Sequence, residues 1–513
     1  MKNGKGFFLY SLGVLAIFLF SSMAAAGPGK VEVQTAGDIT IRMGAQVRII
    51  PTAEIDRDFG LSGQLNHDQE VKAAKKMPFN FGPSTRTHFN ESGGAIKDSH
   101  IRGENRLFFN FAHGSDWDVY MALESDTVLD RRAADRTDFI RGHQSQQFGI
   151  ERLLATFKVP GMNARIKAGW DAQGVDIPYG GLVYGQDDPG IGIMGTANGV
   201  KYEVTYIKSD EDEAGYGLAP TVNPIGYPST GKDEDRTFIY AKAGYNFSGT
   251  YLEAFYLRDE NNLGGGEINN NFIGLQGKCK HGIFKPSFEI AYSFGEDDKN
   301  DADINAFALF ADLAIDLHEM AGMKKFEAHI GGYYIQGDDD PGDDDYEGFM
   351  PAGALHRYTP SFGSEQSFSF DVNPVFGQPL YSMQPIGYGK FENPGLIMFG
   401  GGLKFATGRW AYKGNVMAMW FAENDPVEAY YANLGVSDVE IDDFMGIEWN
   451  NELSYKLYKS VTLKSGVSFL FPGAGGKDIT RALTAYAKGI TFKEAKESDD
   501  IATRLALELL WFF

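Results

Sequence analysis

A two-residue alternation of apolar and polar side chains recurs along the whole of this chain. In residues 39–49, ITIRMGAQVRI, the odd positions are Ile, Met, Ala and Val, and the even positions are Thr, Arg, Gly and Gln. Successive side chains of a strand point to opposite faces, so the pattern predicts a strand with one apolar and one polar face. The same alternation appears in residues 100–111, 164–171, 199–207 and 445–456. An all-β fold is therefore expected.

The lengths of the connections favour a barrel over a sandwich. We predict about eighteen strands, joined alternately by short and long segments, at residues 38–50, 99–112, 116–126, 148–159, 163–171, 187–196, 199–208, 236–247, 250–259, 268–279, 283–294, 303–317, 324–336, 396–407, 410–421, 443–456, 460–470 and 501–513. Short connections such as TANG (196–199) carry the Asn and Gly of tight turns. This predicts a single transmembrane antiparallel up-and-down β-barrel, with short periplasmic turns and long extracellular loops. Sixteen strands is the alternative if the glycine-rich segment 187–196 is not a strand.

The longest connections are expected on the extracellular side, at residues 51–98, 209–235, 337–395 and 471–500. Much of the formal charge of −22 lies in acidic runs within such connections, for example GDDDPGDDD at 337–345. Two interpretations stay open: the runs are solvated loops, or their oxygens bind Ca²⁺ or Mg²⁺. The spacing matches no EF-hand loop, so no metal ligand is assigned.

The first residues have the pattern of an export signal. Lys2 and Lys5 precede an apolar stretch at 7–20, and small residues follow up to Ala26. A retained membrane anchor is disfavoured, because the apolar run is shorter than the ~20 residues of a span. The expected organisation is a cleaved signal peptide, a short periplasmic lead and a barrel in the outer membrane of a Gram-negative cell, at residues 1–26, 27–37 and 38–513.

The last residues, IATRLALELLWFF at 501–513, alternate in the same way. We predict that Leu505 faces lipid and that Arg504 and Glu508 face the interior. The segment is expected to close the barrel against the strand at 38–50, because an unpaired strand edge is not tolerated in a bilayer.

Trp511 and Phe513 are expected in the aromatic girdle at the periplasmic interface. A terminal Phe also resembles the signal that outer-membrane barrels present to their insertion machinery, so the barrel-assembly machinery is an expected partner. Outer-membrane lipid and lipopolysaccharide are the other expected partners. A monomer and a homotrimer both stay open, and no nucleic-acid partner is expected.

The polar faces of the first strands predict the pore lining. The candidate selectivity residues are Arg42, Arg48, Arg102, Arg106, Arg152, Lys158, Arg165, Lys167, Glu104 and Glu124. Guanidinium groups stay charged and present planar donors to carboxylates, so this wall suits an anionic or hydroxyl-rich solute. The alternative is that the charges balance one another and only keep the pore wet.

Other kinds of chemistry find little support in the sequence. A single cysteine, Cys279, excludes a C-x-x-C-H haem motif and multi-cysteine metal sites, so no cofactor is expected. A barrel hydrolase needs a Ser/His or Asp/His constellation. His329 is the one histidine placed clearly in a predicted strand, and no partner motif accompanies it. We expect no enzyme; a barrel hydrolase and a structural sheath or adhesin are the alternatives.

The stretch GIEWNNELSYKLYKSVTLKSGVSFLFPG, residues 446–473, resembles the end of alginate-export-type eighteen-stranded channels. The mature chain as a whole resembles Gram-negative outer-membrane porins. The resemblance implies a solute channel with an electropositive constriction. From the strand pattern we expect a passive diffusion channel for small hydrophilic solutes, and the arginine-rich wall makes anions its candidate preferred solutes. By its order along the chain, the loop at 172–187 is the expected constriction loop.

Overall fold

The structure is a computed structural model of the chain. It describes residues 31–35, 37–74, 76, 97–128, 149–210, 235–262, 267–353, 359–364, 366–369, 373, 375–378, 384–385 and 391–513. The expected signal peptide at 1–26 lies outside the described residues, as does most of the expected loop at 209–235.

Long antiparallel strands make up most of the described chain. The wall strands are β2 (Ile39–Ile55), β3 (Lys97–His113), β4 (Trp117–Val128), β5 (Gly149–Lys158), β6 (Ala164–Gly174), β7 (Gly185–Ala197), β8 (Val200–Asp210), β9 (Arg236–Phe247), β10 (Thr250–Asn261), β11 (Ile268–Cys279), β12 (Phe284–Asp297), β13 (Ala302–Asp316), β14 (Lys325–Ile335), β18 (Leu396–Thr407), β19 (Trp410–Trp420), β20 (Phe444–Tyr458), β21 (Val461–Pro472) and β22 (Ala502–Phe512). The shorter elements are β1 (Val31–Gln34), η2 (Leu61–Gln64), α2 (His67–Ala74), α4 (His318–Ala321), β15 (Asp345–Tyr346), β16 (Gly377–Gln378), β17 (Gln384–Pro385), α5 (Asp425–Asn433), α6 (Ala474–Lys488) and η8 (Phe492–Glu494).

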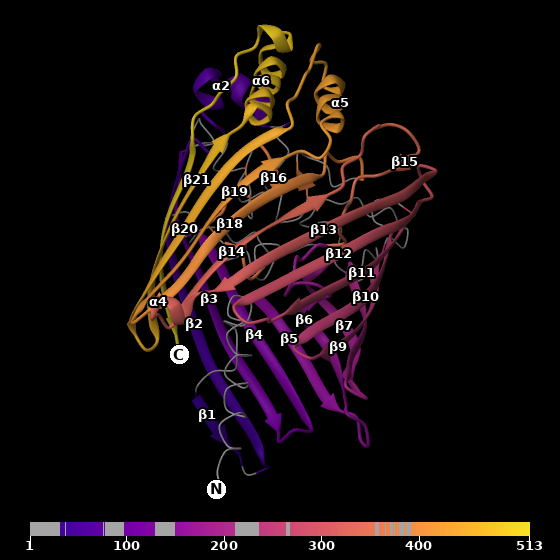
Figure 1. Ribbon diagram of the computed structural model, residues 1–513, viewed down its shortest axis with the longest axis vertical. Helices are drawn as coiled ribbons and strands as arrows, with labels where there is room; N and C mark the ends of the chain where they lie inside the picture. The colour runs from indigo at the N-terminus through magenta and orange to yellow at the C-terminus, as the bar shows by residue number, and fades with distance from the viewer. Residues whose placement is uncertain are drawn as a thin grey trace, which may run out of the picture.

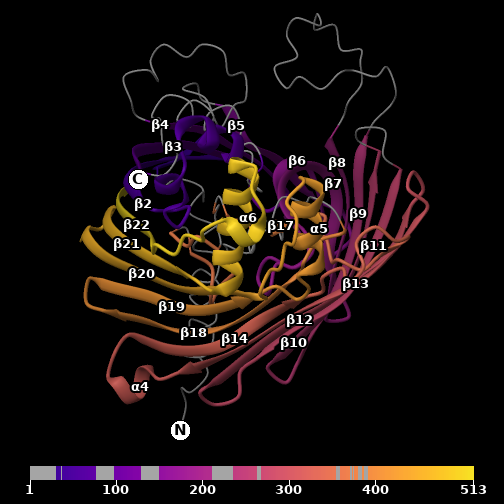
Figure 2. The same cartoon turned by 90° about the horizontal axis from the view of Figure 1, so that it is seen from above.

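The wall strands form a closed barrel. One sheet holds twenty hydrogen-bonded strands, of which β1 and β15 are short additions, and the other eighteen each pair with the next in sequence. The last of them, β22, pairs with β2 and closes the ring. Helices α2, α5 and α6 lie at one end of the barrel, and α4 lies in a turn at the other end (Figure 1). Seen from above, α5 and α6 lie over the interior of the ring (Figure 2).

The structure confirms the predicted fold class and every predicted strand. The glycine-rich segment 187–196 lies in β7, which pairs along most of its length with β6 and β8, so the sixteen-stranded alternative is wrong. The Ala- and Leu-rich segment 303–317 forms β13 and not a helix. The reason is the alternation of its side chains between the two faces of the sheet. Phe307 and Leu309 are 44% and 38% exposed on the outer face, while Phe310 is buried on the inner face.

The outer face of the wall is apolar and the inner face is polar. On β22, Leu505 and Leu507 are 42% and 46% exposed, whereas Arg504 and Glu508 are buried toward the interior. Such a surface suits contact with hydrocarbon on the outside and with water on the inside. No helix among the described residues is long and apolar enough to cross a membrane.

Aromatic side chains mark the two ends of the apolar outer band. Strand β19 begins at Trp410 and ends at Trp420, and both residues share the parity of the outer face. Trp410 contacts Tyr455 with ring centroids 4.5 Å apart, and Trp420 contacts Phe444 at 5.3 Å. A tilted strand of about 9–11 residues spans a bilayer, so the two tryptophans fit the two membrane interfaces.

The seam between β2 and β22 joins the two ends of the barrel sequence. Ala45 and Phe513 exchange two backbone hydrogen bonds, of 2.6 and 3.0 Å. Beyond this point β1 pairs with β2, from Met43 to Thr40, and continues the line of β22. Inside the seam, Arg504 Nε lies 2.6 Å from Glu54 Oε1.

We predict that the Arg504–Glu54 pair stabilises the closed seam. Both side chains are only 4% exposed, and removing one partner of a buried ion pair costs about 3–5 kcal/mol. Arg504→Met should therefore lower the free energy of unfolding of the refolded barrel, measured by denaturant titration in detergent. Arg42→Met, which breaks an exposed pair with Glu32, should cost less than about 1 kcal/mol. Equal effects of the two substitutions would contradict this role of the seam pair.

Candidate functional site

The connection between β6 and β7 crosses the interior of the barrel. We call residues 175–184 the crossing loop; eight of its ten residues are buried, and two of these eight are glycines. Its tip reaches β12, which lies five strands further round the ring than β7, and there the N–H groups of Gly180 and Gly181 donate to Glu289 Oε2 at 2.7 and 3.1 Å. The loop that chain order singles out at 172–187 thus extends across the lumen.

Two further wall strands hold the crossing loop. Gln276 of β11 donates through Nε2 to the carbonyl of Val175 at 2.8 Å. Tyr333 of β14 donates through its hydroxyl to the carbonyl of Gly180 at 3.3 Å. All these wall side chains are buried, so the loop is packed against the far side and not suspended in water.

A second inward segment lies in the long connection between β14 and β18. We call residues 359–364 and 366–369 the lining loop. Glu448 of β20 accepts from the N–H of Phe368 at 2.8 Å, from the N–H of Ser369 at 2.9 Å, and from the Ser369 hydroxyl. A carboxylate that accepts several N–H and O–H groups in a buried site makes strong charge-assisted hydrogen bonds.

Two lysines of the wall also bind the lining loop. Lys404 of β18 and Lys413 of β19 are directly opposite one another, an arrangement of like charges that is unfavourable by itself. Lys404 donates to the carbonyl of Pro360, and Lys413 donates to the carbonyl of Gly363. The loop therefore supplies oxygen atoms where the wall presents adjacent positive charges.

A buried histidine completes the attachment of the lining loop. Nδ1 of His329 lies 3.0 Å from Asp312 Oδ1, and its Nε2 lies 2.9 Å from Asn415 Oδ1. The amide of Asn415 has a fixed orientation, because its Nδ2 donates to the carbonyls of Ser361 and Phe362. Both ring nitrogens of His329 thus lie within hydrogen-bond distance of wall oxygen atoms, and Asn415 links this histidine to the lining loop.

The crossing loop touches the connection that carries the lining loop. Gly353 donates through its N–H to the carbonyl of Val183 at 3.1 Å and accepts from the N–H of Gly185 at 2.5 Å. Tyr333 contacts the crossing loop with its hydroxyl, and its ring centroid lies 6.2 Å from that of Phe362 in the lining loop. The two inward loops therefore form one packed body inside the barrel.

The wall from β22 to β8 carries a band of alternating charges, which we call the charge ladder. Its ion pairs are Arg48 with Glu104 and Glu508, Arg106 with Glu104, Glu124 and Glu151, Arg152 with Glu151, Asp171 and Asp187, Arg165 with Asp118, and Lys167 with Glu203. The shortest contacts of Arg106, to Glu104 and Glu124, are both 2.5 Å. Every base in this ladder has at least one carboxylate beside it, and the eight carboxylates of these ion pairs outnumber the five bases.

The other sequence-predicted pore residues lie toward the ends of the barrel. Arg42 is 44% exposed in its side chain and pairs with Glu32 of β1 at 2.9 Å. Lys158 ends β5 and is exposed. Arg102 is 43% exposed in its side chain and lies 3.4 Å from Glu104.

Glu151 is a member of the charge ladder that sequence reasoning did not single out. A register shift in the pairing of β4 with β5 turns both Glu151 and Arg152 to the interior. Glu151 Oε2 then accepts from Arg106 Nε at 3.0 Å. The signal was an apolar–polar–polar–apolar run at residues 150–153, which interrupts the two-residue period where a β-bulge occurs.

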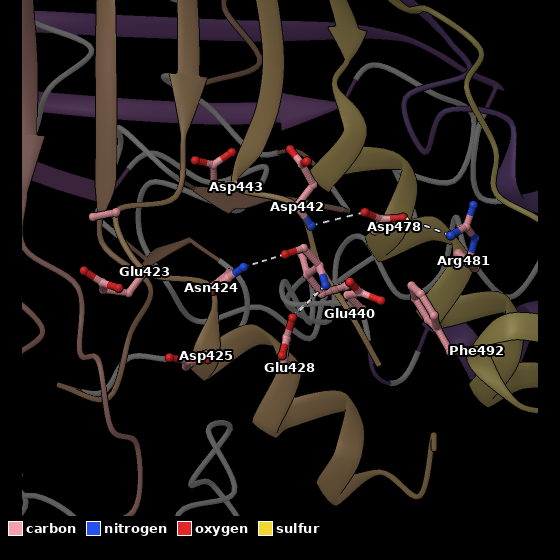
Figure 3. A pocket seen from close by; sticks show the side chains of 12 residues that line it. Glu423, Asn424, Asp425, Glu428, Glu440, Asp442, Asp443, Asp478, Arg481 and Phe492 are labelled. Carbon is pink, nitrogen blue, oxygen red and sulfur yellow. Dashed lines mark hydrogen bonds and ion pairs between the residues drawn. The ribbon is translucent and has the colours of Figure 1, made fainter. Parts of the chain in front are cut away.

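An acidic cleft lies beside α5 and α6 at the loop end of the barrel (Figure 3). It has a volume of about 780 Å³, and its charged lining residues are Glu423, Asp425, Glu428, Glu440, Asp442, Asp443, Asp478 and Arg481. Burial raises the pKa of Asp478, whose Oδ2 accepts from the N–H of Asp442 at 3.1 Å. No three acidic, His or Cys side chains of the described residues are arranged to hold a metal ion. The cleft is a negatively charged surface at the entrance.

We predict that Glu448 anchors the lining loop. Glu448→Ala removes the shared acceptor, and each charge-assisted hydrogen bond contributes about 1.5–3 kcal/mol. Amide hydrogen exchange of residues 366–369 should therefore accelerate by at least about tenfold in the detergent-refolded protein. Glu260→Ala, which removes an exposed carboxylate paired with Arg258, is the control and should leave the exchange unchanged. Unchanged exchange in Glu448→Ala would rule out the anchor.

Comparisons with known proteins give matches among solved structures alone. No protein-family model and no curated protein matches the chain. OccK9 (OpdG) from Pseudomonas aeruginosa aligns over 92% of this chain and 98% of its own, with 12% identity and a TM-score of 0.50. The outer membrane protein OpdK of that species and a BenF-like porin from Pseudomonas fluorescens Pf-5 each align over 92% of this chain and 99% of their own. Their identities are 12% and 10%, and both TM-scores are 0.48. The similarity to OccK9 supports the closed barrel fold.

Proposed function

We propose that this protein is an outer-membrane porin that lets small hydrophilic solutes diffuse passively. The observation that carries the proposal is a closed sheet of eighteen wall strands with an apolar outer face and a charged inner face. Wall side chains alone do not fill a barrel of this strand number, so water has a path through it. Catalysis is not part of the proposal: His329 is buried, and its Nδ1 lies 3.0 Å from Asp312 Oδ1.

The inward loops narrow the path and restrict it to small solutes. The crossing loop divides the lumen by reaching from β6 and β7 to Glu289 on β12. The lining loop covers the inner face of β18 to β20. The charge ladder lies on the wall from β22 to β8, and we place the solute path along it.

The ladder suits polar solutes, with a preference for anions as the finer part of the proposal. Guanidinium groups keep their charge and offer planar donors. The exposed Arg102 and Lys158 keep positive charge near the water. Carboxylates beside each ladder base, and the acidic cleft at the entrance, act in the opposite direction, so the preference is expected to be weak.

Location and partners belong to the same proposal. The barrel lies in a Gram-negative outer membrane, with outer-membrane lipid and lipopolysaccharide around the apolar band, after export by the signal peptide at 1–26. A relation to alginate-export-type channels rests on residues 446–473 alone. A structural sheath or adhesin would share the wall, but it would need no loops attached across the lumen.

The proposal predicts discrete conductance steps when the refolded protein is added to a planar lipid bilayer. Anions should permeate at least as well as cations of similar size. A protein that inserts without conducting would contradict the proposed function.

Arg106 is the ladder residue whose loss should change selectivity most. Arg106→Gln removes the positive charge that contacts Glu104, Glu124 and Glu151. The reversal potential in a salt gradient should then shift toward cation preference. Arg42→Gln, at an exposed end of β2, is the matched control and should shift it less. Equal reversal potentials for wild type and Arg106→Gln would remove the ladder from the solute path.

Recognition of Phe513 by the barrel-assembly machinery can be separated from stability. The side chain is 56% exposed, while its backbone pairs with Ala45. Phe513→Ala keeps the backbone pairing, so refolding in detergent should be unchanged, whereas the amount of assembled protein in the outer membrane should fall severalfold. Wild-type levels in the membrane would argue against a recognition role.

A further inference from the structure

We propose that the crossing loop is a proton-controlled gate, in which a proton shared by Asp176 and Glu289 holds the loop against β12 and its loss at higher pH releases the loop. The effect on transport rests on the proposed porin function. The movement of the loop does not, and it can be measured separately.

Two carboxyl groups meet in a fully buried contact at the attachment of the loop. Asp176 belongs to the crossing loop and Glu289 to β12, and both side chains have no exposed surface. The two carboxyl groups lie close enough to share a hydrogen bond, and the Asp176 oxygens also accept from the N–H groups of Val183 and Tyr184. Two ionised carboxylates have no hydrogen to donate, so this bond requires a proton between them.

The hydrogen-bond partners of the two Glu289 oxygen atoms indicate where the shared proton would lie. Glu289 Oε2 accepts from the N–H groups of Gly180 and Gly181. Its Oε1 is buried, and no N–H or O–H group in the described part of the chain donates to it. A carboxyl proton between Glu289 Oε1 and Asp176 satisfies this atom. Without it, a buried acceptor and two adjacent negative charges remain, which is costly.

The surroundings supply little compensating positive charge. Lys242 of β9 acts on Asp176, but its Nζ also lies 3.2 Å from Glu203 and 2.9 Å from the carbonyl of Gly174. From β14 and β13 the facing groups are Tyr333 and Asp312, neither of which is a cation.

The tip of the crossing loop adds the remaining titratable groups. Tyr179 faces Glu289 and Glu253 of β10. Lys278 of β11 lies over the Tyr179 ring, 5.4 Å from its centroid. This lysine sits over an aromatic face and makes no direct ion pair with Asp176 or Glu289 among the described contacts.

The sign of the pH dependence follows from burial. Burial raises the pKa of the Asp176 carboxyl, so the closed loop retains its proton at a pH where a released carboxyl, with a pKa near 4, is ionised. The closed state is therefore favoured at low pH. Within the window between the two values, each pH unit shifts the equilibrium toward the released loop by about tenfold.

Amide hydrogen exchange of residues 175–184 tests the gate in the refolded protein. After correction for the intrinsic pH dependence of exchange, wild type should exchange at least about tenfold faster at about pH 8 than at about pH 5. Glu289→Gln places an amide N–H₂ where Oε1 lies and donates to Asp176 without a titrating proton. Its loop should stay protected at both pH values.

Glu327→Gln is the matched control, because Glu327 lies on β14 and pairs with Lys285, away from the crossing loop. It should keep the wild-type pH response. Equal protection of wild type at both pH values would overturn the gate, and so would an unchanged pH response in Glu289→Gln. If Glu289→Gln does not fold, the wild-type titration decides alone.

Conductance adds a second and separate readout. Wild-type conductance should rise with pH, and that of Glu289→Gln should not. If the protein never conducts, the proposed porin function is wrong. The hydrogen-exchange measurement would still test the gate in that case. A conducting protein whose crossing loop shows no pH-dependent exchange would defeat the gate alone.

Discussion

Pairing every backbone N–H and C=O within the wall is the constraint on which the rest of this structure depends. A sheet in hydrocarbon cannot leave an edge open, so β22 must pair with β2. Once the ring is closed, strand parity sets the direction of each side chain: Leu505 outward, Arg504 inward. The same closure fixes the strand number and creates an interior that wall side chains do not fill.

The interior is occupied by chain that returns from the loop end and by charges that neutralise one another. The crossing loop reaches Glu289, and the lining loop reaches Glu448, so in both cases a wall carboxylate accepts backbone N–H groups of a loop. On the remaining wall, cross-strand register places Arg48 beside Glu104 and Arg106 beside Glu124. A narrowed passage lined by ion pairs follows from these contacts, and it suits polar solutes better than any single ion.

The wall could be predicted from sequence because a two-residue period is a local property. The strand at 187–196 was recognised even with its glycines, since the order of short and long connections required it. Glu151 was not predicted as an inward-facing residue, because a β-bulge interrupts the two-residue period at this position. The contact of Asp176 with Glu289 joins residues far apart in the chain, and no sequence pattern in either segment predicts it. The pairing of strands follows from a local periodicity that the sequence shows, whereas the position of a loop inside the barrel depends on the structure of the whole folded barrel.

Liposome swelling with uncharged solutes of increasing size tests the central claim most directly, because it reports the width of the passage. The account predicts that monosaccharides enter proteoliposomes rapidly and that uptake falls steeply for larger oligosaccharides, as the crossing and lining loops require. Rapid uptake of large oligosaccharides would mean that the loops do not narrow the barrel. No uptake of monosaccharides would mean that the barrel is not a channel.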